Sequence, residues 1–295
     1  MLPAALVACL LAVSQDSSVL LVRILDVSDS RIGGEAILIT DSSDGRGQHV
    51  LLDASDRGRT VVSWLELFGV DSLAAVILSH PHADHYGGID EVLGWFPVGA
   101  FVYAGTPRSA VTYRVLLRQI DELGIPVVTA DSGVRRLTLV TGSDSVVLLL
   151  IAPPPACRVL ASDDGDDINN CSLGVKLVRD GFTMLLPGDG EENLLAWWMA
   201  QYDTLLHADV LKAGHHGSRN ATNAAWLDAV RPQAVVISAN GRQHPFAEVL
   251  GLLATRGIPT YCTADHGTIT VRVPRSGPWT VTTERPGTCH ARTRS

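Results

Sequence analysis

The amino-acid sequence predicts an α/β protein in which two β-rich halves, flanked by helices, form a layered sandwich. Short runs of branched apolar residues alternate with segments of helical apolar spacing, as where Ala74–Leu78 is followed by Ile89–Phe96. The 295 residues are 46% hydrophobic and 18% charged, which is typical of a chain with a large folded core. The alternation occurs twice, and Pro153–Asn170, with a proline run and an acidic loop, is the predicted join between the halves.

Local patterns assign the elements in order along the chain. Runs rich in branched apolar residues predict strands, and helical spacing that ends at Gly69, Gly124 or Gly257 predicts helices. The predicted strands are Val19–Val27, Ala36–Thr40, Val50–Asp53, Ala74–Leu78, Phe101–Tyr103, Pro126–Thr129, Val134–Thr141, Val146–Ile151, Leu173–Arg179, Thr183–Leu186, Val210–Lys212, Ala234–Ser238, Thr260–Cys262 and Thr268–Val273. The predicted helices are Thr60–Phe68, Ile89–Phe96, Ser109–Leu123, Glu191–Gln201 and Ala247–Arg256.

The two ends of the chain differ from its middle. We expect residues 1–18 to be a signal peptide or membrane anchor, 19–275 to form one domain, and 276–295 to be a loose polar tail. Leu2–Val13 has the length of a signal-peptide hydrophobic region, although no Lys or Arg precedes Arg23. Export or anchoring is favoured over a cytoplasmic location, and no later segment is apolar for long enough to span a bilayer.

Charge and cysteine content narrow the class of protein. The formal net charge of −8 argues against coating nucleic acid through bulk charge, although a local basic groove stays open. No two of the five cysteines form a C-x-x-C pair. We expect buried or free thiols, with a single bridge as the alternative.

The run His80-Pro81-His82-Ala83-Asp84-His85 predicts a metal site. Two residues apart on an extended segment, His80 and His82 point to the same side. These two imidazoles suit one cation, while Asp84 and His85 suit another. Mixed nitrogen and oxygen ligands favour zinc, with manganese or iron as alternatives.

A site for two divalent metal ions needs further ligands from distant strand ends. Asp189 follows a strand, lies between glycines, and can bridge two cations through its carboxylate. His215 and His216 follow another strand, and one of them would complete the second metal site. The position of His215 nearer the strand end favours it, with His216 as the alternate.

With these motifs, the chain resembles the metallo-β-lactamase superfamily over about residues 19–273, specifically the hydrolase domain of ComEC-type DNA-uptake (competence) proteins and their stand-alone relatives. The resemblance implies a four-layer αββα sandwich, two metal ions and hydrolysis by a metal-activated water. The matching segments are Ile24–Val27, Ala36–Ile39, Leu51–Asp53, Ser79–Gly88, Asn169–Leu173, Gly188-Asp189, His215–Ser218 and His244-Pro245.

Two departures from the family pattern bear on the site. The loop Ser28–Glu35 replaces the usual Gly-Gln-Gly-Asp and could change the substrate mouth. No histidine lies between His85 and His207, so the third ligand that many members give the first metal is missing. That metal would depend on His80, His82, Asp189 and water, and would bind more weakly.

The resemblance also implies roles in catalysis and substrate binding. Asp84 would orient the attacking water. His244 would contact a phosphoryl oxygen or protonate the leaving group, with a turn histidine of no catalytic role as the alternative. The remaining candidates are Asn169, Ser172 and Ser218 for substrate binding, and Lys212 and Arg219 for offsetting phosphate charge, unless these two are solvated surface charges.

The resemblance implies a phosphodiester substrate, either nucleic acid or a related phosphoester. Two alternatives stay open: a hydrolase of a small lactone, thioester or β-lactam, and a domain that binds nucleic acid without cutting it. The oligomeric state stays open as well.

Overall fold

The structure is a computed structural model that describes residues 19–30, 33–42, 47–139, 146–159 and 165–291. The predicted signal peptide or anchor at residues 1–18 lies outside these ranges. Within them, no helix combines the length and the apolar character that crossing a membrane requires.

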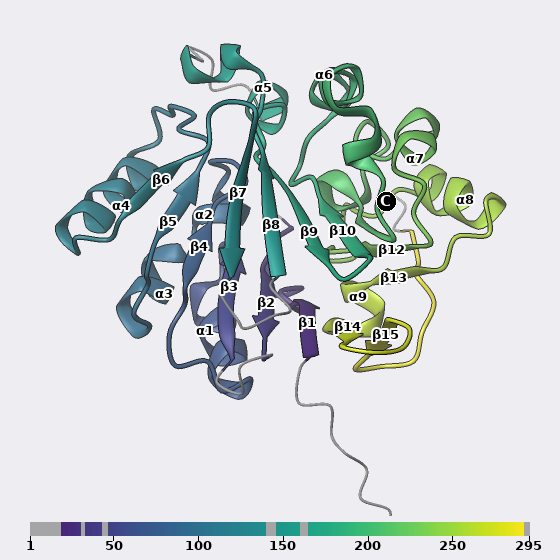
Figure 1. The fold of residues 1–295 in the computed structure, drawn as a ribbon, viewed down its shortest axis with the longest axis horizontal. Helices are drawn as coiled ribbons and strands as arrows, with labels where there is room; N and C mark the ends of the chain where they lie inside the picture. Colours follow the sequence, from purple (N-terminus) through teal and green to yellow (C-terminus); the bar gives the residue numbers. More distant parts are fainter. Residues whose placement is uncertain (1–18, 31–32, 43–46, 140–145, 160–164, 292–295) are drawn as a thin grey trace, which may run out of the picture.

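Two mixed β-sheets, stacked face to face, form the centre of the molecule (Figure 1). The first sheet has eight strands in the order β15-β14-β1-β2-β3-β4-β5-β6. Their bounds are β1 Val19–Ile24, β2 Ile37–Asp41, β3 Gln48–Leu52, β4 Ala75–Ile77, β5 Phe101–Tyr103, β6 Val127–Thr129, β14 Ile269–Pro274 and β15 Thr280–Thr283. From β3 to β6 the strands run parallel, so their carboxyl ends share one edge.

The second sheet has seven strands in the order β13-β12-β11-β10-β9-β8-β7. Their bounds are β7 Val134–Leu139, β8 Val146–Ile151, β9 Gly174–Arg179, β10 Phe182–Leu186, β11 Val210–Lys212, β12 Ala234–Ile237 and β13 Thr260–Cys262. Strands β10 to β13 are parallel, and their carboxyl ends also share an edge.

Helices cover the outer face of each sheet, which confirms the predicted four-layer αββα sandwich. The first sheet carries α1 (Gly58–Leu67), α3 (Ile89–Trp95) and α4 (Val111–Glu122); the second carries α6 (Glu192–Tyr202), α7 (Ala224–Val230) and α8 (Ala247–Thr255). Short helices α2 (Ala83–Tyr86), α5 (Gly165–Asn169) and α9 (Thr263–His266), and 3-10 turns η1 (Pro155–Val159), η2 (Asp203–Leu206) and η3 (Gly214–Gly217), lie in the connections.

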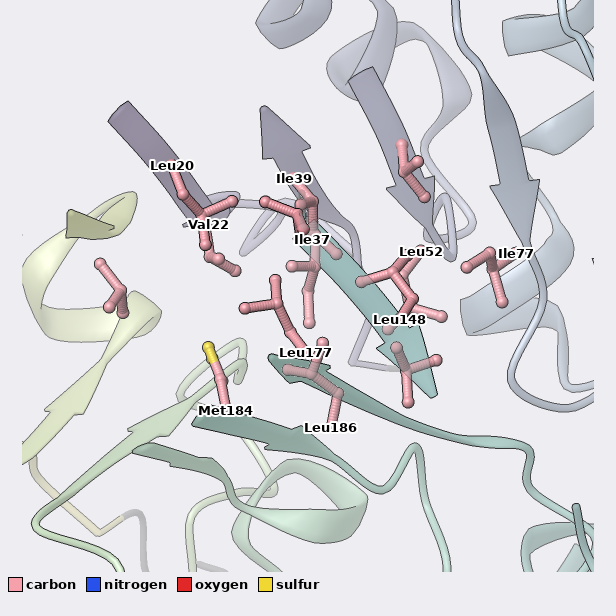
Figure 2. Packing of buried hydrophobic residues seen from close by; sticks show 14 of the residues in the cluster. Leu20, Val22, Ile37, Ile39, Leu52, Ile77, Leu148, Leu177, Met184 and Leu186 are labelled. Carbon is pink, nitrogen blue, oxygen red and sulfur yellow. The ribbon is translucent and has the colours of Figure 1, made fainter. Parts of the chain in front are cut away.

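Three apolar clusters fill the spaces between the four layers. The central one lies between the sheets and includes Ile37, Ile39 and Leu177 (Figure 2). Leu38, between the two isoleucines of β2, packs instead with the helices on the outer face. Because successive side chains of a strand point to opposite faces, a strand buried on both sides needs a continuous apolar run. This explains why β2 is buried throughout.

The predicted join between halves at Pro153–Asn170 is wrong. Strand β8 before this segment and strand β9 after it are antiparallel neighbours in one sheet. The chain changes sheets between β6 and β7, at residues 130–133, and changes back between β13 and β14. Hydrophobic pattern identifies a strand, but pairing partners are set by contacts distant in the sequence.

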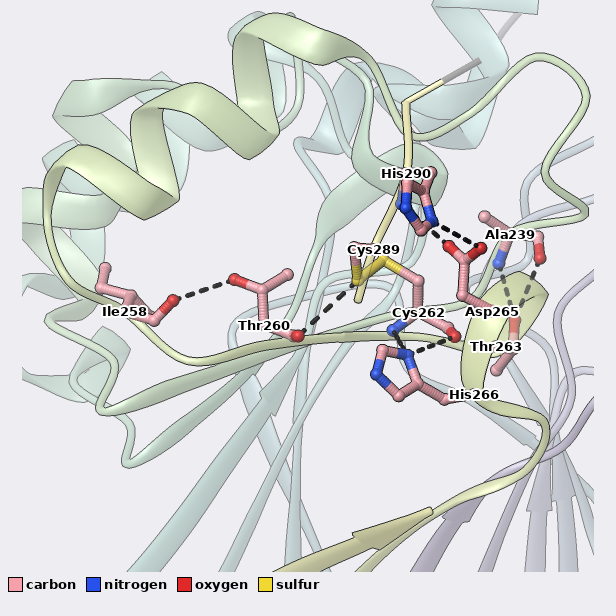
Figure 3. The surroundings of a disulfide bond; sticks show 9 residues. All are labelled: Ala239, Ile258, Thr260, Cys262, Thr263, Asp265, His266, Cys289 and His290. Carbon is pink, nitrogen blue, oxygen red and sulfur yellow. Dashed lines mark hydrogen bonds and ion pairs between the residues drawn. A yellow bond between two sulfur atoms is a disulfide. The ribbon is translucent and has the colours of Figure 1, made fainter. Parts of the chain in front are cut away.

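The predicted loose tail at residues 276–295 is described as far as residue 291, and this part is attached to the fold. Thr280–Thr283 forms β15, which pairs with β14 at the edge of the first sheet. Further on, Cys289 forms a disulfide with Cys262 at the end of β13 (Figure 3). The tail is therefore attached to both sheets.

Four of the five cysteines form two disulfides, so the expectation of free thiols is wrong. Cys157 pairs with Cys171 across 14 residues, and Cys262 pairs with Cys289 across 27 residues. Neither pair follows a recognisable spacing, because the fold and not the sequence interval brings the sulfur atoms together.

We expect the Cys262→Ala/Cys289→Ala variant to lose about 3 kcal/mol of unfolding free energy, because the disulfide restricts the unfolded chain. Denaturant titration without reductant measures the loss. Oxidised wild-type protein, which keeps both disulfides, is the comparison. A double variant as stable as the oxidised wild type would contradict the expectation.

Candidate metal centre

The predicted site residues come from strand ends on both sheets. Asp53 follows β3, His80 lies three residues after β4, and Asp189 follows β10. The turn that carries His215 and His216 follows β11. Because these strands are parallel within each sheet, their carboxyl ends place the loops on one edge of the sandwich, where such scaffolds hold reactive groups.

Four side chains form a compact group that can hold a metal ion: Asp84, His85, Asp189 and His216. One ligand atom from each lies within 4.8 Å of the others. His85 Nε2 and His216 Nε2 are 3.2 and 3.3 Å from Asp189 Oδ2, and His216 Nε2 is 3.6 Å from Asp84 Oδ2. The buried atom His216 Nε2 makes no hydrogen bond. A divalent cation suits this set of nitrogen and oxygen donors.

Both histidines of this group are held through their other ring nitrogen. His85 Nδ1 is 2.8 Å from Asp53 Oδ2, and His216 Nδ1 is 2.9 Å from the carbonyl oxygen of Ser238. When Nδ1–H donates to such an acceptor, Nε2 is left unprotonated and directed at the metal position. Asp53 therefore supports the site, although sequence reasoning placed it only in a matching segment.

The geometry favours His216, and not the preferred His215, as the ligand after β11. Both residues have left-handed backbones, with φ of 54° and 44°. This conformation is costly for residues other than glycine and directs the two rings differently. His215 Nδ1 lies 2.7 Å from Glu191 Oε1, outside the four-residue group. Sequence distance from the strand end carried no information about this turn.

His80 and His82 lie beside the four-residue group. His80 Nε2 is 2.9 Å from His82 Nδ1, and the His80 ring is 4.2 Å from that of His85. Burial, with the nearby histidines, holds the pKa of His80 well below its usual range. Burial also lowers the pKa of His82 to about 4. Both rings are therefore neutral at neutral pH, the form in which imidazole binds metals.

The carboxylates set the charge of the group. Although burial opposes it, Asp189 and Asp84 raise the pKa of His216 to about 9. Burial likewise opposes the ionisation of Asp189, but His216, His85 and Lys212 hold its pKa well below the usual range. In the metal-free protein, protons on imidazole thus offset carboxylate charge.

Two predicted substrate-binding residues are buried supports. Ser172 is fully buried, and its Oγ accepts a hydrogen bond from the Asp189 N–H at 3.2 Å. Ser218 is buried, and its hydroxyl donates to Asn220. These contacts favour holding the loops over touching a substrate.

The third, Asn169, also bonds within the protein. Its Nδ2 donates to Glu191 Oε1 at 2.9 Å, so it fixes the carboxylate that holds His215. Sequence reasoning missed Glu191, although it stands two residues after Asp189.

His244 lies at the partly exposed rim, with its ring 5.2 Å from that of His215 and 6.0 Å from that of His216. Burial, together with these two histidines, lowers the pKa of His244 to about 3. A neutral imidazole favours hydrogen bonding to a substrate oxygen over supplying a proton to a leaving group.

The two predicted phosphate-binding cations lie in different environments. Lys212 is fully buried and paired with Glu35, so it is not a surface charge. Arg219 is 68% exposed and lies 3.5 Å from Glu248. Sequence reasoning missed Arg108, whose Nη1 donates to the carbonyl oxygen of Pro81 inside the histidine motif.

The altered loop also takes part in the site. Gly33 has a φ of 118°, and a Cβ there would lie 3.5 Å from Asp84 Oδ2 and from the His216 ring. The backbone therefore approaches the metal ligands closely, in a conformation that favours glycine.

Comparison with known proteins agrees with this fold. Residues 32–159 match the family model described as Metallo-beta-lactamase superfamily. CmlA, a diiron β-hydroxylase from Streptomyces venezuelae, aligns with a TM-score of 0.50 and 14% identity over 87% of this chain and 54% of its own. This likeness shows the metallo-β-lactamase fold, and the chain has a His/Asp cluster able to hold metal.

The predicted resemblance to competence proteins is also confirmed. The chain is 29% identical to ComE operon protein 3 of Bacillus subtilis (strain 168) over 217 residues, which cover 72% of this chain and 26% of that protein. It is 27% identical to Competence protein ComA of Neisseria gonorrhoeae over 261 residues, which cover 82% of this chain and 33% of that protein. The matched part is thus about a quarter to a third of these relatives.

Replacing each histidine of the turn tests the ligand assignment. We expect His216→Ala to weaken metal binding by about a hundredfold or more, whereas His215→Ala keeps the four-residue group and its metal. Mass spectrometry of metal content after dialysis measures both. Greater loss in His215→Ala than in His216→Ala would contradict the geometry.

The protonation of His216 predicts a pH dependence of metal binding. Since its pKa is about 9 without metal, a cation must displace the proton at neutral pH. Affinity should therefore rise with pH up to about 9, by about tenfold per pH unit for each proton displaced. Calorimetry in buffers of different ionisation enthalpy counts the protons; no release at pH 7 would contradict this.

Proposed function

We propose that this chain is a metal-dependent phosphodiesterase that uses a metal-activated water. The observation that carries the proposal is the group Asp84, His85, Asp189 and His216, with both imidazoles fixed so that Nε2 faces the carboxylates. A divalent cation held there, zinc foremost with manganese or iron as alternatives, supplies a Lewis acid and lowers the pKa of a bound water. Two cations remain the proposed number, and the other one, called the first metal above, would bind at His80 and His82.

The burial of the residues defines a floor and a rim. His85, Asp189 and His216 are almost fully inaccessible, whereas the Asp84 side chain is 17% exposed and that of His215 is 25% exposed. A substrate would thus approach from the rim. Although burial opposes it, His216 and His85 lower the pKa of Asp84. Asp84 is then an ionised acceptor that can orient an attacking water.

Arg108 favours an anionic substrate over a neutral one. Its positive charge lies close enough to His82 to contribute to the lowered pKa of that ring, after burial, and its Nε makes no hydrogen bond. A guanidinium beside a metal cluster suits a phosphoryl oxygen. The net charge of the chain is −8, which repels an anionic substrate. A cation beside the site would offset this repulsion for a phosphodiester.

The relatives support the same substrate class. One of them is called a competence protein, and the ComEC-type resemblance implies nucleic acid. The whole-protein role would need parts that this chain does not align with, since it covers 33% of that relative. Hydrolysis of a small lactone, thioester or β-lactam, and nucleic-acid binding without cleavage, are the competing functions.

We also infer that the domain faces an oxidising compartment, in keeping with the expected export or membrane anchoring. The support is the pairing of Cys157 with Cys171 and of Cys262 with Cys289. Disulfides persist in exported proteins and are rare in the reducing cytoplasm.

A substrate panel tests the function. Metal-loaded protein is assayed on a chromogenic phosphodiester, single-stranded DNA, an acyl thioester and a β-lactam, and we expect turnover of the phosphodiesters. Arg108→Gln should raise KM for the phosphodiester about tenfold, because a hydrogen bond to a charged group is lost.

Arg219→Gln is the matched control, because it removes an exposed cation that is already paired with Glu248. Its KM should stay within about twofold of wild type, as expected for a solvated pair. Turnover of the thioester or β-lactam alone would overturn the proposal. DNA binding that persists without any turnover would favour the non-catalytic alternative.

A further inference from the structure

A fully buried ammonium lies between two buried carboxylates directly behind the metal group. The Lys212 side chain is fully inaccessible, its Nζ contacts Glu35 Oε2, and it lies 3.5 Å from Asp189 Oδ1. Nζ also donates to the carbonyl oxygen of Gly188 at 3.3 Å. Lys212 therefore contacts both the side chain of Asp189 and the backbone just before it.

These contacts give the two oxygens of Asp189 different surroundings. Oδ1 faces Lys212, whereas Oδ2 lies 3.2 Å from His85 Nε2 and 3.3 Å from His216 Nε2. A carboxylate that bridges two cations uses one oxygen for each, or shares a single oxygen. With Oδ1 directed at the ammonium, only Oδ2 faces the histidines.

Glu35 connects Lys212 to the backbone of Asp84, another member of the metal group. Its backbone N–H donates to the Asp84 carbonyl oxygen at 3.1 Å, and its own carbonyl oxygen accepts from Ser55 N–H at 2.8 Å. Glu35 is fully buried, and its ion pair is with Lys212. One residue thus links the backbone of Asp84 to the side chain of Asp189.

A buried ion pair is seldom retained for stability, since apolar residues of similar volume often replace one without loss. This pair lies beside Asp189. We propose that Glu35 and Lys212 are positioning residues that hold Asp189 so that it offers Oδ2, and not both oxygens, to a metal. The inference rests on the proposed function only in that the group binds a metal.

The Glu35→Gln/Lys212→Met variant tests whether these two residues position Asp189, because it removes their contacts without changing the net charge around Asp189. It removes one negative and one positive charge, so the net charge behind Asp189 is unchanged. We expect metal affinity, measured by competition with a chromophoric chelator, to fall about ten- to hundredfold, as for other residues that orient ligands. The visible absorption of bound Co²⁺ should change as well, because the ligand geometry changes.

Lys176→Met is the matched control. Lys176 is also a buried lysine of the second sheet, but its Nζ donates to the carbonyl oxygens of Leu205 and His207, away from the metal group. This variant should keep wild-type metal affinity and the wild-type Co²⁺ spectrum, whatever its stability.

If the double variant does not fold, Glu35→Asp tests the proposal, because it keeps both charges and shortens the carboxylate by one methylene. Wild-type affinity and spectrum in a folded variant would overturn the inference, as would a wild type that binds no metal. A protein that binds metal, responds to these changes and cleaves no phosphodiester would overturn only the proposed function.

Discussion

Carboxyl groups buried at the shared edge of two sheets impose the constraint on which the rest of the site depends. Asp189 lies among His85, His216 and Lys212, all of them almost inaccessible to water. Ionised groups are costly to bury without compensation. In the metal-free protein, protons on the imidazoles compensate part of the carboxylate charge. A divalent cation would displace these protons and take over that compensation. The same electrostatics therefore favour an intact fold and an affinity for metal.

The sandwich can bury these charged groups because different parts of it stabilise the fold and form the site. Three apolar clusters stabilise the stacked sheets and helices, and the charged groups of the site lie in the loops beyond them. The loops at one edge are then free to carry charged groups, and their conformations are tied to the core by specific contacts. Asp53 and the Ser238 carbonyl oxygen hold the two histidines, and Ser172 holds the backbone of Asp189. The left-handed turn at His215 and His216 is a local cost that directs one ring to the metal group and the other to Glu191.

Much of the fold could be predicted from local pattern. Phe101–Tyr103, Val210–Lys212 and Thr260–Cys262 have the predicted bounds, because short apolar runs between turn residues leave little choice. The short helix α2 and the strand β15 were missed. The connectivity of the sheets and both disulfides were also missed, since each depends on segments that meet only after folding.

The sequence by itself determined the histidine motif and most strands, because these are carried by adjacent residues or by strong hydrophobic periodicity. It also predicted Asp189 as a distant partner, and its resemblance to the metallo-β-lactamase superfamily implied the αββα class. Only the tertiary structure decided that His216 faces the metal group and that Lys212 is buried against Glu35. The physical reason is that a side chain's direction after a strand end depends on backbone dihedrals and on neighbours from other strands. Glu35 and Lys212 are 177 positions apart in the sequence, and no local pattern pairs their charges.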